Sequence, residues 1–560
     1  MVRIQKIKSF NDLVSFCNSQ GYTDFTDIQK NAFLSDDFYS NKNIFVIGET
    51  SSGKTLIAQL AIVMAEKRKA LYMVPYRALA RQKAKEIQEF FKDDLDVLIS
   101  TSEHRENDMN IITAQVDIAV IIYEKAFLFA ALYPQFLDQY DIIIFDEFGL
   151  IDDEERGIKA DFLFAWSKNK SHSRCVVLAT PNYNWSLYAE PDDFLVVQSK
   201  LRPVNLLKVD VIRKQVYVPN MSKKVFTLKT RGDEPLISFD GASGNLIDIL
   251  IYICKHHTSM KHKILIFKND RTGVIEKATT LYIDLINNGI ISKPKKENVS
   301  ALKEKILERM QISEDNLYLV FDDFCFEMML SGISFHSAAL PFELRHEIEN
   351  EFLNDGGLLS IVFATETLAF GLNSGVDVVV VASIFKPNGS SNKITISKNE
   401  YQNYIGRAGR LGLRSISYVY TIIPHNRLEL WDNLLSMDIE KIESRLFEKD
   451  AEYAAMYLLS LIPKSPNSIN IPEIKSQLAS LLCDSLETIK RHHLFFATIE
   501  TQCTMLESRG LIAKDDSSFD ESYFIPDKGQ KLQGYIIGLD TYDTLNKLVL
   551  FFNNKEYKIF

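Results

Sequence analysis

Short apolar segments alternate with longer, charged and amphipathic segments through about residue 420 of this 560-residue chain. The apolar segments are rich in Val, Ile and Phe. Continuous apolar runs of this length, separated by helix-like segments, are typical of a parallel sheet that is buried on both faces. The pattern therefore predicts an α/β fold with two units in series. The expected strands are Ile44–Ile47, Leu71–Val74, Val97–Ser100, Ile118–Ile122, Ile142–Phe145 and Val176–Ala179 in the first unit, and Ile264–Phe267, Ile333–His336, Ile361–Ala364 and Val378–Ala382 in the second.

Other segments interrupt or follow this alternation. A stretch with Pro219, Gly232 and Pro235 comes after residue 205 and predicts a linker. The Lys- and Glu-rich stretch Ser292–Asn316 favours a solvated helical insertion over a binding patch. Beyond about residue 428, the pattern predicts helices at Ile439–Leu461 and Ile474–Leu482 and a turn or hairpin at Asp515–Tyr523.

The charge balance bears on the partner of the chain. The 64 Lys and Arg against 74 Asp and Glu give a net charge of −10, which by itself argues against a nucleic-acid partner. No apolar run approaches the ~18 residues of a membrane span, and no secretory signal is visible, so we expect no membrane partner. The six cysteines form no C-x-x-C pair, which fits a reducing, cytoplasmic location. We interpret His256, His257 and His262 as surface residues, because they have no ligand spacing with Cys or Asp.

The segment from Gly48 to Thr55 fits the phosphate-binding pattern G-x-x-x-x-G-K-[ST]. It follows an expected strand and opens an expected helix, so backbone N–H groups would face phosphate oxygens. We expect Lys54 to reach the β- and γ-phosphates of ATP and the Thr55 hydroxyl to ligate Mg²⁺. A glycine-rich turn without a ligand is the alternative. The nucleotide-binding residues expected here are Gly48, Thr50, Gly53, Lys54 and Thr55.

Two acidic residues, Asp146 and Glu147, follow the expected strand Ile142–Phe145. The carboxyl ends of strands are where open α/β sheets place their ligand chemistry. We expect Asp146 to hold Mg²⁺ through its second shell of ligands, and Glu147 to orient and activate the attacking water. Both residues are therefore candidate catalytic residues, together with Lys54.

Positive charge for the transferring phosphoryl group is available in the second unit. The string Gly406-Arg407-Ala408-Gly409-Arg410 places two arginines three residues apart, on one side of a helical turn. We expect Arg407 and Arg410 to be catalytic and the site to be completed when the two units close. A solvated basic turn is the alternative reading of this string.

Further motifs occur in a fixed order along the chain. They are GYTDFTDIQ ending at Gln29, Val74–Ala80, Tyr123–Lys125, Arg156-Gly157, Ala179-Thr180, Arg202-Pro203, Phe335–Pro341, Ala364–Asn373 and Tyr401–Arg410. Together with the phosphate-binding segment and Asp146-Glu147, they resemble the superfamily-two DExH helicases, specifically the superkiller (Ski)-like branch. The resemblance implies two tandem RecA-like parallel-sheet domains followed by an α-rich winged-helix domain. The implied bounds are 1–205, 206–425 and 426–525, with 526–560 as a tail or the start of an abbreviated helical ratchet domain.

The resemblance also implies roles for individual residues. Gln29 would read adenine, and Gly371 and Asn373 would contribute to the nucleotide site. The hairpin-like segment Ser383–Ser397 would split the duplex with Phe385 near its base, because stacking on a base offsets most of the cost of melting one step. A plain connecting ribbon is the alternative for this segment. The residues expected to contact the nucleic-acid strand are Pro75, Arg77, Thr101, Thr365 and Phe385.

Three positions depart from the family pattern. Gly149 stands where the family has His, Asn403 where the branch usually has Gln, and Leu178 where the family has Ser. In the family, that His and Gln link hydrolysis to strand movement. Our hypothesis is that the ATPase chemistry is intact but its coupling to unwinding is altered.

The function implied by these motifs is an ATP-dependent helicase or translocase that moves 3′ to 5′ on single-stranded or partly duplex DNA or RNA. The alternative is an ATP-gated binding or remodelling subunit of a larger complex, with a protein partner that supplies processivity or coupling. For either function, the net charge of −10 predicts a modest basic groove inside an acidic shell, because a translocating enzyme must also release phosphates.

Overall fold

The computed structural model of the chain describes residues 7–50, 52–92, 94–101, 103–133, 135–153, 156–169, 172–186, 188–199, 201–202, 204–218, 221–230, 245–258, 260–310, 321–337, 339–354, 356–365, 375–388, 390–409, 416–437, 462–463, 467–482, 499–501, 503–516, 522–530, 542–544 and 546–547. The chain divides into two compact units. One combines Met1–Gly48, Lys54–Gln198 and Glu440–Phe560, and the other combines Ser199–Ile439 with the short segment Glu49–Gly53. Within the described ranges, none of the helices has both the length and the apolar character needed to cross a bilayer.

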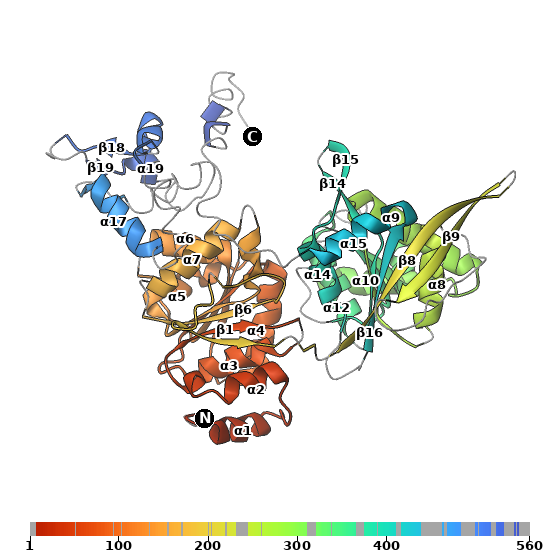
Figure 1. Cartoon of the computed structure of the whole chain (residues 1–560), viewed down its shortest axis with the longest axis horizontal. Helices are drawn as coiled ribbons and strands as arrows, with labels where there is room; N and C mark the ends of the chain where they lie inside the picture. The colour runs from red at the N-terminus through yellow and green to blue at the C-terminus, as the bar shows by residue number, and fades with distance from the viewer. Residues whose placement is uncertain are drawn as a thin grey trace. The chain divides into compact units, whose positions relative to one another are not determined.

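The first unit contains a parallel sheet, of which β1 and β6 are labelled in Figure 1. Its seven strands have the order β3-β4-β2-β5-β6-β1-β7. All six strands expected here from the sequence are confirmed, and the edge strand β7 was not predicted. The strands are β1 (Asn43–Ile47), β2 (Ala70–Val74), β3 (Val97–Ser100), β4 (Ile118–Ile122), β5 (Ile142–Phe145), β6 (Arg174–Ala179) and β7 (Phe194–Gln198).

Helices cover both faces of this sheet, which is why its strands are apolar throughout. One face packs against α1 (Phe10–Ser19), α2 (Asp27–Phe33), α3 (Lys54–Met64) and α4 (Arg77–Phe91). The other packs against α5 (Asp108–Ile112), α6 (Tyr123–Leu132) and α7 (Gly157–Asn169). Because every connection to a parallel strand crosses over, the loops that follow the strands gather at one edge of the sheet.

The second unit contains another seven-stranded sheet, in the order β11-β12-β10-β13-β16-β8-β9. All pairs are parallel except β8 with β9. The four predicted strands are confirmed. The strands are β8 (Asn205–Val218), β9 (Met221–Thr230), β10 (Ile264–Phe267), β11 (Ile333–His336), β12 (Ile361–Ala364), β13 (Val378–Val381) and β16 (Ile416–Pro424), and the helices are α8 (Leu246–Thr258), α9 (Arg271–Asn287), α10 (Lys296–Met310), α11 (Asp323–Leu330), α12 (Phe342–Leu353), α14 (Lys398–Gly406) and α15 (Leu428–Ser436).

The predicted linker after residue 205 is wrong. The residues after 205 form β8 and β9, a long antiparallel ribbon whose pairing runs from Val209 with Thr230 to Val218 with Met221. The ribbon extends the second sheet, because β8 also pairs in parallel with β16. Its buried apolar residues, such as Val209 and Val211, alternate with polar ones, so the segment lacks the continuous apolar run of the other strands. Pro219, Gly232 and Pro235 lie outside the described residues.

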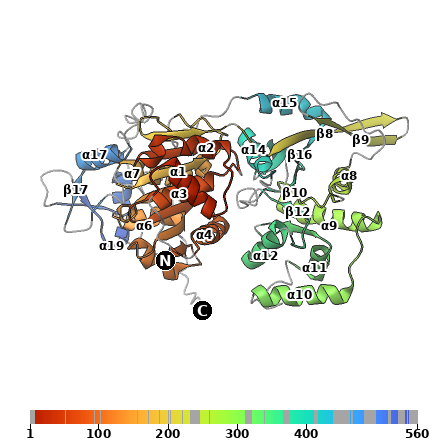
Figure 2. The same cartoon turned by 90° about the horizontal axis from the view of Figure 1, so that it is seen from below.

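The predicted helical insertion is confirmed as α10, which lies beside α11 in the second unit (Figure 2). Val299, Leu302 and Ile306 are buried and form the apolar stripe of the helix. These residues are spaced three and four apart, as expected for a helix with one packed face. The helix is thus part of the fold and its other faces are solvated.

The described C-terminal elements beyond residue 440 belong to the first unit. A three-stranded antiparallel sheet combines β17 (Ile469–Asn470), β19 (Ser522–Phe524) and β18 (Ala513–Lys514), and helix α17 (Ile471–Leu482) packs on α7. The pairing of β18 with β19 confirms the predicted turn or hairpin, and α17 confirms the helix predicted at Ile474–Leu482. The helix predicted at Ile439–Leu461 lies outside the described residues. Helix α19 (Asp527–Gln530) follows β19.

The interpretation of the histidines as surface residues is wrong for two of the three. His256 is exposed, but His257 and His262 are buried, with their Nδ1 atoms 2.9 Å apart. The Nε2 atom of His257 is 2.9 Å from the hydroxyl of Tyr420 on β16. Burial, with the neighbouring His262 and His256 adding to it, lowers the pKa of His257 to about 3. Tyr420 lies 163 residues after His257 in the sequence, so the spacing of neighbouring residues could not predict this contact.

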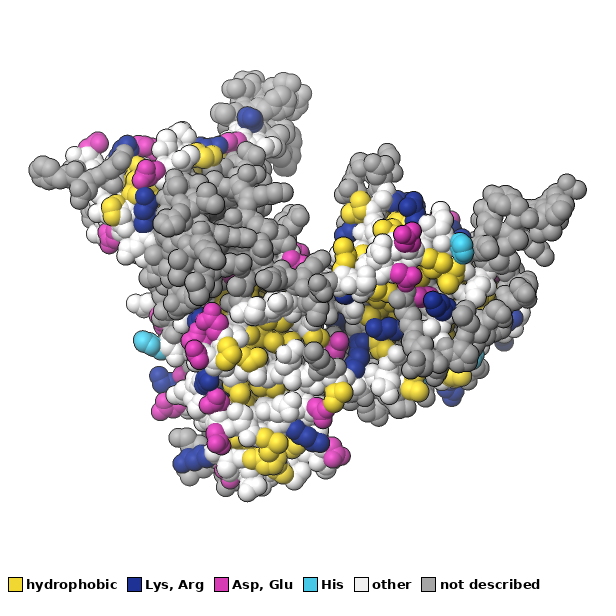
Figure 3. All heavy atoms as spheres, viewed as in Figure 1, with side chains coloured by type: hydrophobic (Ala, Val, Ile, Leu, Met, Phe, Trp, Pro, Cys, Tyr) yellow, Lys and Arg dark blue, Asp and Glu magenta, His cyan; other side chains and the backbone are white. Residues whose placement is uncertain are grey.

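Acidic and basic side chains are interspersed over the described surface in the view of Figure 3. The net charge of −10 is therefore not gathered into one acidic block among the described side chains on this face.

Candidate nucleotide-binding and strand-binding sites

The predicted phosphate loop connects β1 to α3 at the carboxyl edge of the first sheet. Gly53 has a φ of +92°, a conformation that favours glycine, and Lys54 and Thr55 open α3. The ammonium of Lys54 is buried and donates a hydrogen bond of 2.6 Å to the carbonyl oxygen of Gly48. The loop therefore curls around its own lysine, as a phosphate-binding loop requires. Thr50 also lies in this loop.

Asp146 follows β5, and both oxygens of its buried carboxylate accept hydrogen bonds. The Tyr72 hydroxyl donates to Oδ2 at 2.8 Å, and the Glu147 amide donates to Oδ1 at 2.9 Å. Burial and the charge of Asp146 raise the pKa of Tyr72 well above its ordinary value, which keeps the hydroxyl a donor. The carboxylate is thus held in one orientation.

Glu147 lies directly after Asp146 and adopts a left-handed conformation with a φ of +49°. Such a conformation costs free energy for a residue with a side chain, and in proteins it concentrates at functional positions. Glu147 is partly exposed, so its carboxylate is accessible from the carboxyl edge of the sheet. This placement suits a residue that orients a water molecule.

Lys83 belongs to this site and was not predicted from the sequence. Its ammonium donates to the hydroxyl oxygen of Thr55 at 2.8 Å and to Glu86 Oε2 at 3.0 Å, and it lies 3.7 Å from Asp146 Oδ2. Only 1% of the side chain is exposed. Burial favours the neutral amine, but Asp146 and Glu86 outweigh it and raise the pKa of Lys83 above its ordinary value.

A sequence signal for Lys83 exists. Helix α4 buries an apolar stripe, and Lys83 falls on that stripe rather than on the solvated face of the helix. A charged residue on a buried stripe needs a partner of opposite charge. The stripe residues are Leu79, Ala80, Ala84 and Ile87.

The residues present fit a magnesium ion. A threonine hydroxyl and a carboxylate are the hard oxygen ligands that Mg²⁺ takes in nucleotide sites. The cationic Lys83 near both Thr55 and Asp146 shows that these oxygens attract positive charge. Thr55 would ligate the ion directly and Asp146 would hold it through bound water.

Gln29 lies in the first turn of α2, where it is buried. Its side-chain oxygen accepts a hydrogen bond of 2.9 Å from the Thr26 amide and forms a capping box with it. The capping box fixes the orientation of the amide group. A role in reading adenine stays a prediction.

The second unit supplies the other predicted nucleotide-site residues. Arg407 ends α14 and is buried, and its carbonyl oxygen accepts a hydrogen bond of 2.7 Å from the Val376 amide. Asn403 lies on the same helix. Arg410, Gly371 and Asn373 lie outside the described residues.

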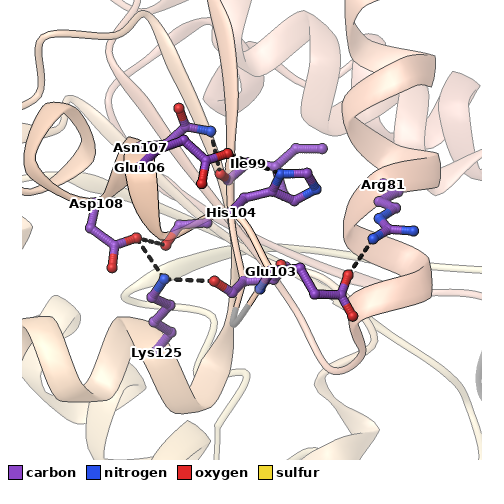
Figure 4. Close-up of polar contacts among 10 residues, drawn as sticks. Arg81, Ile99, Glu103, His104, Glu106, Asn107, Asp108 and Lys125 are labelled. Carbon is purple, nitrogen blue, oxygen red and sulfur yellow. Dashed lines mark hydrogen bonds and ion pairs between the residues drawn. The ribbon is translucent and has the colours of Figure 1, made fainter. Parts of the chain in front are cut away.

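Arg77, one of the strand-binding residues expected after β2, lies in a cluster of ion pairs. Arg77 and Arg81, on the first two turns of α4, both pair with Glu103, which follows β3. Figure 4 shows the pair between Arg81 and Glu103. The Arg77 pair is 3.8 Å long, and the side chain of Glu103 remains 30% exposed. Glu103 and Arg81 were not predicted. Pro75 is buried at the end of β2.

Thr101 lies beside this cluster but is fully buried. Its hydroxyl oxygen accepts a hydrogen bond of 3.3 Å from the Glu103 amide, and its carbonyl oxygen accepts one of 2.7 Å from Lys125. Lys125 also pairs with Asp108 at 2.5 Å (Figure 4). The geometry makes Thr101 a support for the loop that presents Glu103.

Thr365 and Phe385 lie in the second unit. Thr365 follows β12, is buried, and donates its amide to the His336 carbonyl oxygen at 3.3 Å. The predicted hairpin is present as β14 (Phe385–Asn388) and β15 (Ser390–Thr395). Phe385 lies at its base, half-buried against the core, with the Arg427 guanidinium 5.9 Å from its ring centre. Its stacking role stays a prediction.

Gly149, the departure from the family pattern, lies two residues after Glu147. A Cβ atom added there would lie 3.5 Å from the Tyr183 ring and 3.8 Å from the Thr180 hydroxyl, both ordinary contact distances. The backbone at this position therefore accepts a side chain. Neither the local conformation nor crowding at the Cβ position explains the glycine.

Comparison with known proteins agrees with this geometry. Residues 26–185, which contain the phosphate loop, Asp146 and Glu147, match the DEAD/DEAH box helicase family. The chain is 27% identical over 380 residues to the ATP-dependent DNA helicase Hel308 of Thermoplasma volcanium, covering 67% of this chain and 49% of the relative. Against Hel308 of Caldivirga maquilingensis the identity is 28% over 378 residues, covering 67% and 46%. Against Hel308 of Methanocella arvoryzae it is 26% over 415 residues, covering 72% and 52%.

The chain thus spans about half the length of the curated relatives it matches. It is similar to DEAD/DEAH box helicases through the nucleotide site and to Hel308 DNA helicases over about two thirds of its own length.

Proposed function

We propose that the chain is an ATP-dependent helicase or translocase that hydrolyses ATP with Mg²⁺ and moves 3′ to 5′ along single-stranded nucleic acid. The observation that carries the proposal is the meeting of Thr55, Lys83 and Asp146 at the carboxyl edge of the first sheet. A phosphate loop and an acidic pair at that edge are the parts that phosphoryl transfer to water requires.

In this proposal each residue has a defined task. Lys54 leaves the Gly48 carbonyl and binds the terminal phosphates, and the loop amides bind the remaining phosphate oxygens. Glu147 orients the attacking water and accepts its proton. Bound Mg²⁺ would neutralise charge on the phosphates, held by Thr55 and, through water, by Asp146. Arg407 and Arg410 would stabilise charge on the transferring phosphoryl group.

The proposed substrate is DNA, single-stranded or with a duplex to be opened. The support is that the similar proteins are named ATP-dependent DNA helicases. Arg77 and Arg81 would bind strand phosphates without reading sequence. The base-contacting role of Phe385 and the strand contacts of Pro75, Thr101 and Thr365 belong to the same proposal.

The finer assignment is also part of the proposal. We assign the chain to the Ski-like branch, with RecA-like domains at 1–205 and 206–425 and a winged helix at 426–525. Gly149 and Asn403 would alter the coupling between hydrolysis and unwinding. We therefore also propose a protein partner that supplies processivity or restores the coupling. The described cysteines are free thiols, which supports an intracellular location.

The experiment that tests the function measures ATP hydrolysis with and without matched single-stranded DNA and RNA, and then strand displacement. Substrates with a 3′ overhang, a 5′ overhang and blunt ends separate the two directions. The proposal predicts hydrolysis stimulated by DNA and displacement from the 3′ overhang. Stimulated hydrolysis without displacement would select the ATP-gated binding or remodelling subunit, and absence of hydrolysis would refute both.

A further inference from the structure

Three oxygen-bearing side chains converge on the ammonium of Lys83. Thr55 Oγ1 and Glu86 Oε2 lie 2.8 and 3.0 Å from it, and Asp146 Oδ2 lies 3.7 Å away. Two of these groups, Thr55 and Asp146, are the pair expected to hold Mg²⁺. Glu86 lies one helical turn after Lys83 on α4 and points to the same cation.

We propose that Lys83 is a positioning residue that occupies the magnesium site as a resident cation until the metal arrives. In the arrangement described above, its ammonium orients the Thr55 hydroxyl and balances the charge of Asp146. When Mg²⁺ enters with a nucleotide, the ammonium moves away from Thr55 and is retained by Glu86. This inference rests on the proposed function, because it assumes that the site receives a metal–nucleotide complex.

The need for movement follows from charge. Lys83 donates a hydrogen bond to the same hydroxyl oxygen that would ligate Mg²⁺, so both cations would share one small atom. Two positive charges on one oxygen in a buried site repel strongly, since little water screens them. The lysine chain is long and its three N–H donors rotate freely, so a shift toward Glu86 needs no backbone change.

Two contacts prepare the site for the exchange. Tyr72 keeps its hydrogen bond to Asp146 Oδ2, and the Glu147 amide keeps its bond to Oδ1. The carboxylate therefore retains its orientation after the ammonium leaves. Glu86 is partly exposed, so it can hold the displaced cation near water.

The experiment measures binding of Mn²⁺ to the full chain in the presence of ADP, by the loss of the free-ion signal in electron paramagnetic resonance. No hydrolysis is involved. Replacing Lys83→Met removes the ammonium and keeps an unbranched side chain that is one atom shorter. We expect the Mn²⁺ concentration at half-saturation to fall about tenfold, the equivalent of one hydrogen bond to a charged group. The melting temperature of the metal-free variant should also fall, because Asp146 loses its counter-charge.

Lys85→Met is the matched control. Lys85 lies on the same helix, is 80% exposed, and pairs with Glu89 at 3.9 Å. It should leave the Mn²⁺ midpoint unchanged. If Lys83→Met leaves the midpoint unchanged or raises it, Lys83 is only a structural ion-pair partner and the proposal is overturned.

A second variant acts in the opposite direction. Glu86→Gln removes the carboxylate that would receive the ammonium, and a neutral amide binds the ammonium less strongly than a carboxylate does. The lysine should therefore stay on Thr55, and the Mn²⁺ concentration at half-saturation should rise about threefold. This variant changes a partly exposed residue, and it tests the proposal even if Lys83→Met does not fold. An unchanged or lower midpoint contradicts the exchange. Failure of the unmodified protein to bind Mn²⁺ with ADP at all refutes the proposed function as well.

Discussion

We expect Glu103 to weaken the attraction of phosphate to the proposed strand site. Its carboxylate pairs with both Arg77 and Arg81, the two cations that α4 presents beside the end of β2. A phosphate that binds either arginine must compete with that carboxylate. We therefore expect Glu103→Gln to strengthen binding of single-stranded DNA, although it removes ion pairs from the folded protein.

The size of the effect follows from the two pairs. Glu103 is 30% exposed, so each pair lies near the surface and is worth about 0.2–1 kcal/mol. Releasing both would lower the free energy of binding by about 0.4–2 kcal/mol, or roughly 2- to 30-fold in Kd. Each arginine that gains a phosphate also releases counterions, so the slope of log Kd against log salt should steepen by up to about 1.4 for two contacts.

The assay is fluorescence anisotropy of a labelled single strand without nucleotide, repeated over a range of salt concentrations. Glu106→Gln is the matched control, because it makes the same change in net charge three residues away. The Glu106 side chain is 66% exposed and pairs with His104 rather than with the arginines. If the two variants show equal affinities and equal salt slopes, only net charge matters and the competition by Glu103 is refuted.

Three further predictions concern other parts of the chain. Lys54→Ala should abolish ATP hydrolysis and leave strand binding within about twofold, since the lysine contacts the phosphate loop; retained turnover would refute the site. Gly149→His, with Asn403 unchanged, should raise the number of base pairs opened per ATP, since a Cβ atom there meets only ordinary contacts; unchanged coupling would contradict the hypothesis. In the folded protein, burial lowers the pKa of His257 to about 3, whereas in the unfolded chain the pKa is about 6.5. Between these two values only the unfolded chain binds the proton, so the free energy of unfolding should fall by about 1.4 kcal/mol for each pH unit of acidification. Denaturant unfolding at pH 7 and pH 5 should show a smaller loss for His257→Gln than for the exposed control His256→Gln; equal losses would contradict this assignment.

The strands of the two parallel sheets could be predicted from the sequence because burial on both faces leaves continuous apolar runs. Such runs mark β1 to β6 and β10 to β13 without reference to the rest of the chain. The ribbon of β8 and β9 has alternating residues instead, and its Pro and Gly neighbours favoured a linker. Its identity depends on pairing with β16, about two hundred residues further along the chain.

The nucleotide site could be predicted as a motif but not as a set of contacts. The phosphate-binding pattern identified Lys54 and Thr55, because their roles require fixed residue types at a fixed spacing. The position directly after a buried strand identified Asp146. Lys83 and Glu103 follow no such spacing: each acquires its partners only when strand ends and α4 pack together. His257 was misplaced for the same reason, since its environment comes from Tyr420 on a distant strand.

Helix α4 carries Arg77 and Arg81 of the proposed strand site and, further along the same helix, Lys83 and Glu86 of the proposed metal site. A single stiff element thus belongs to two binding sites. Thermodynamic linkage then fixes a symmetry between them: if a bound strand tightens the metal–nucleotide complex by some factor, that complex must tighten the strand by the same factor. The strand affinity measured with and without the metal–nucleotide complex gives a ratio. The affinity for that complex measured with and without the strand must give the same ratio, which yields the coupling free energy between the two sites.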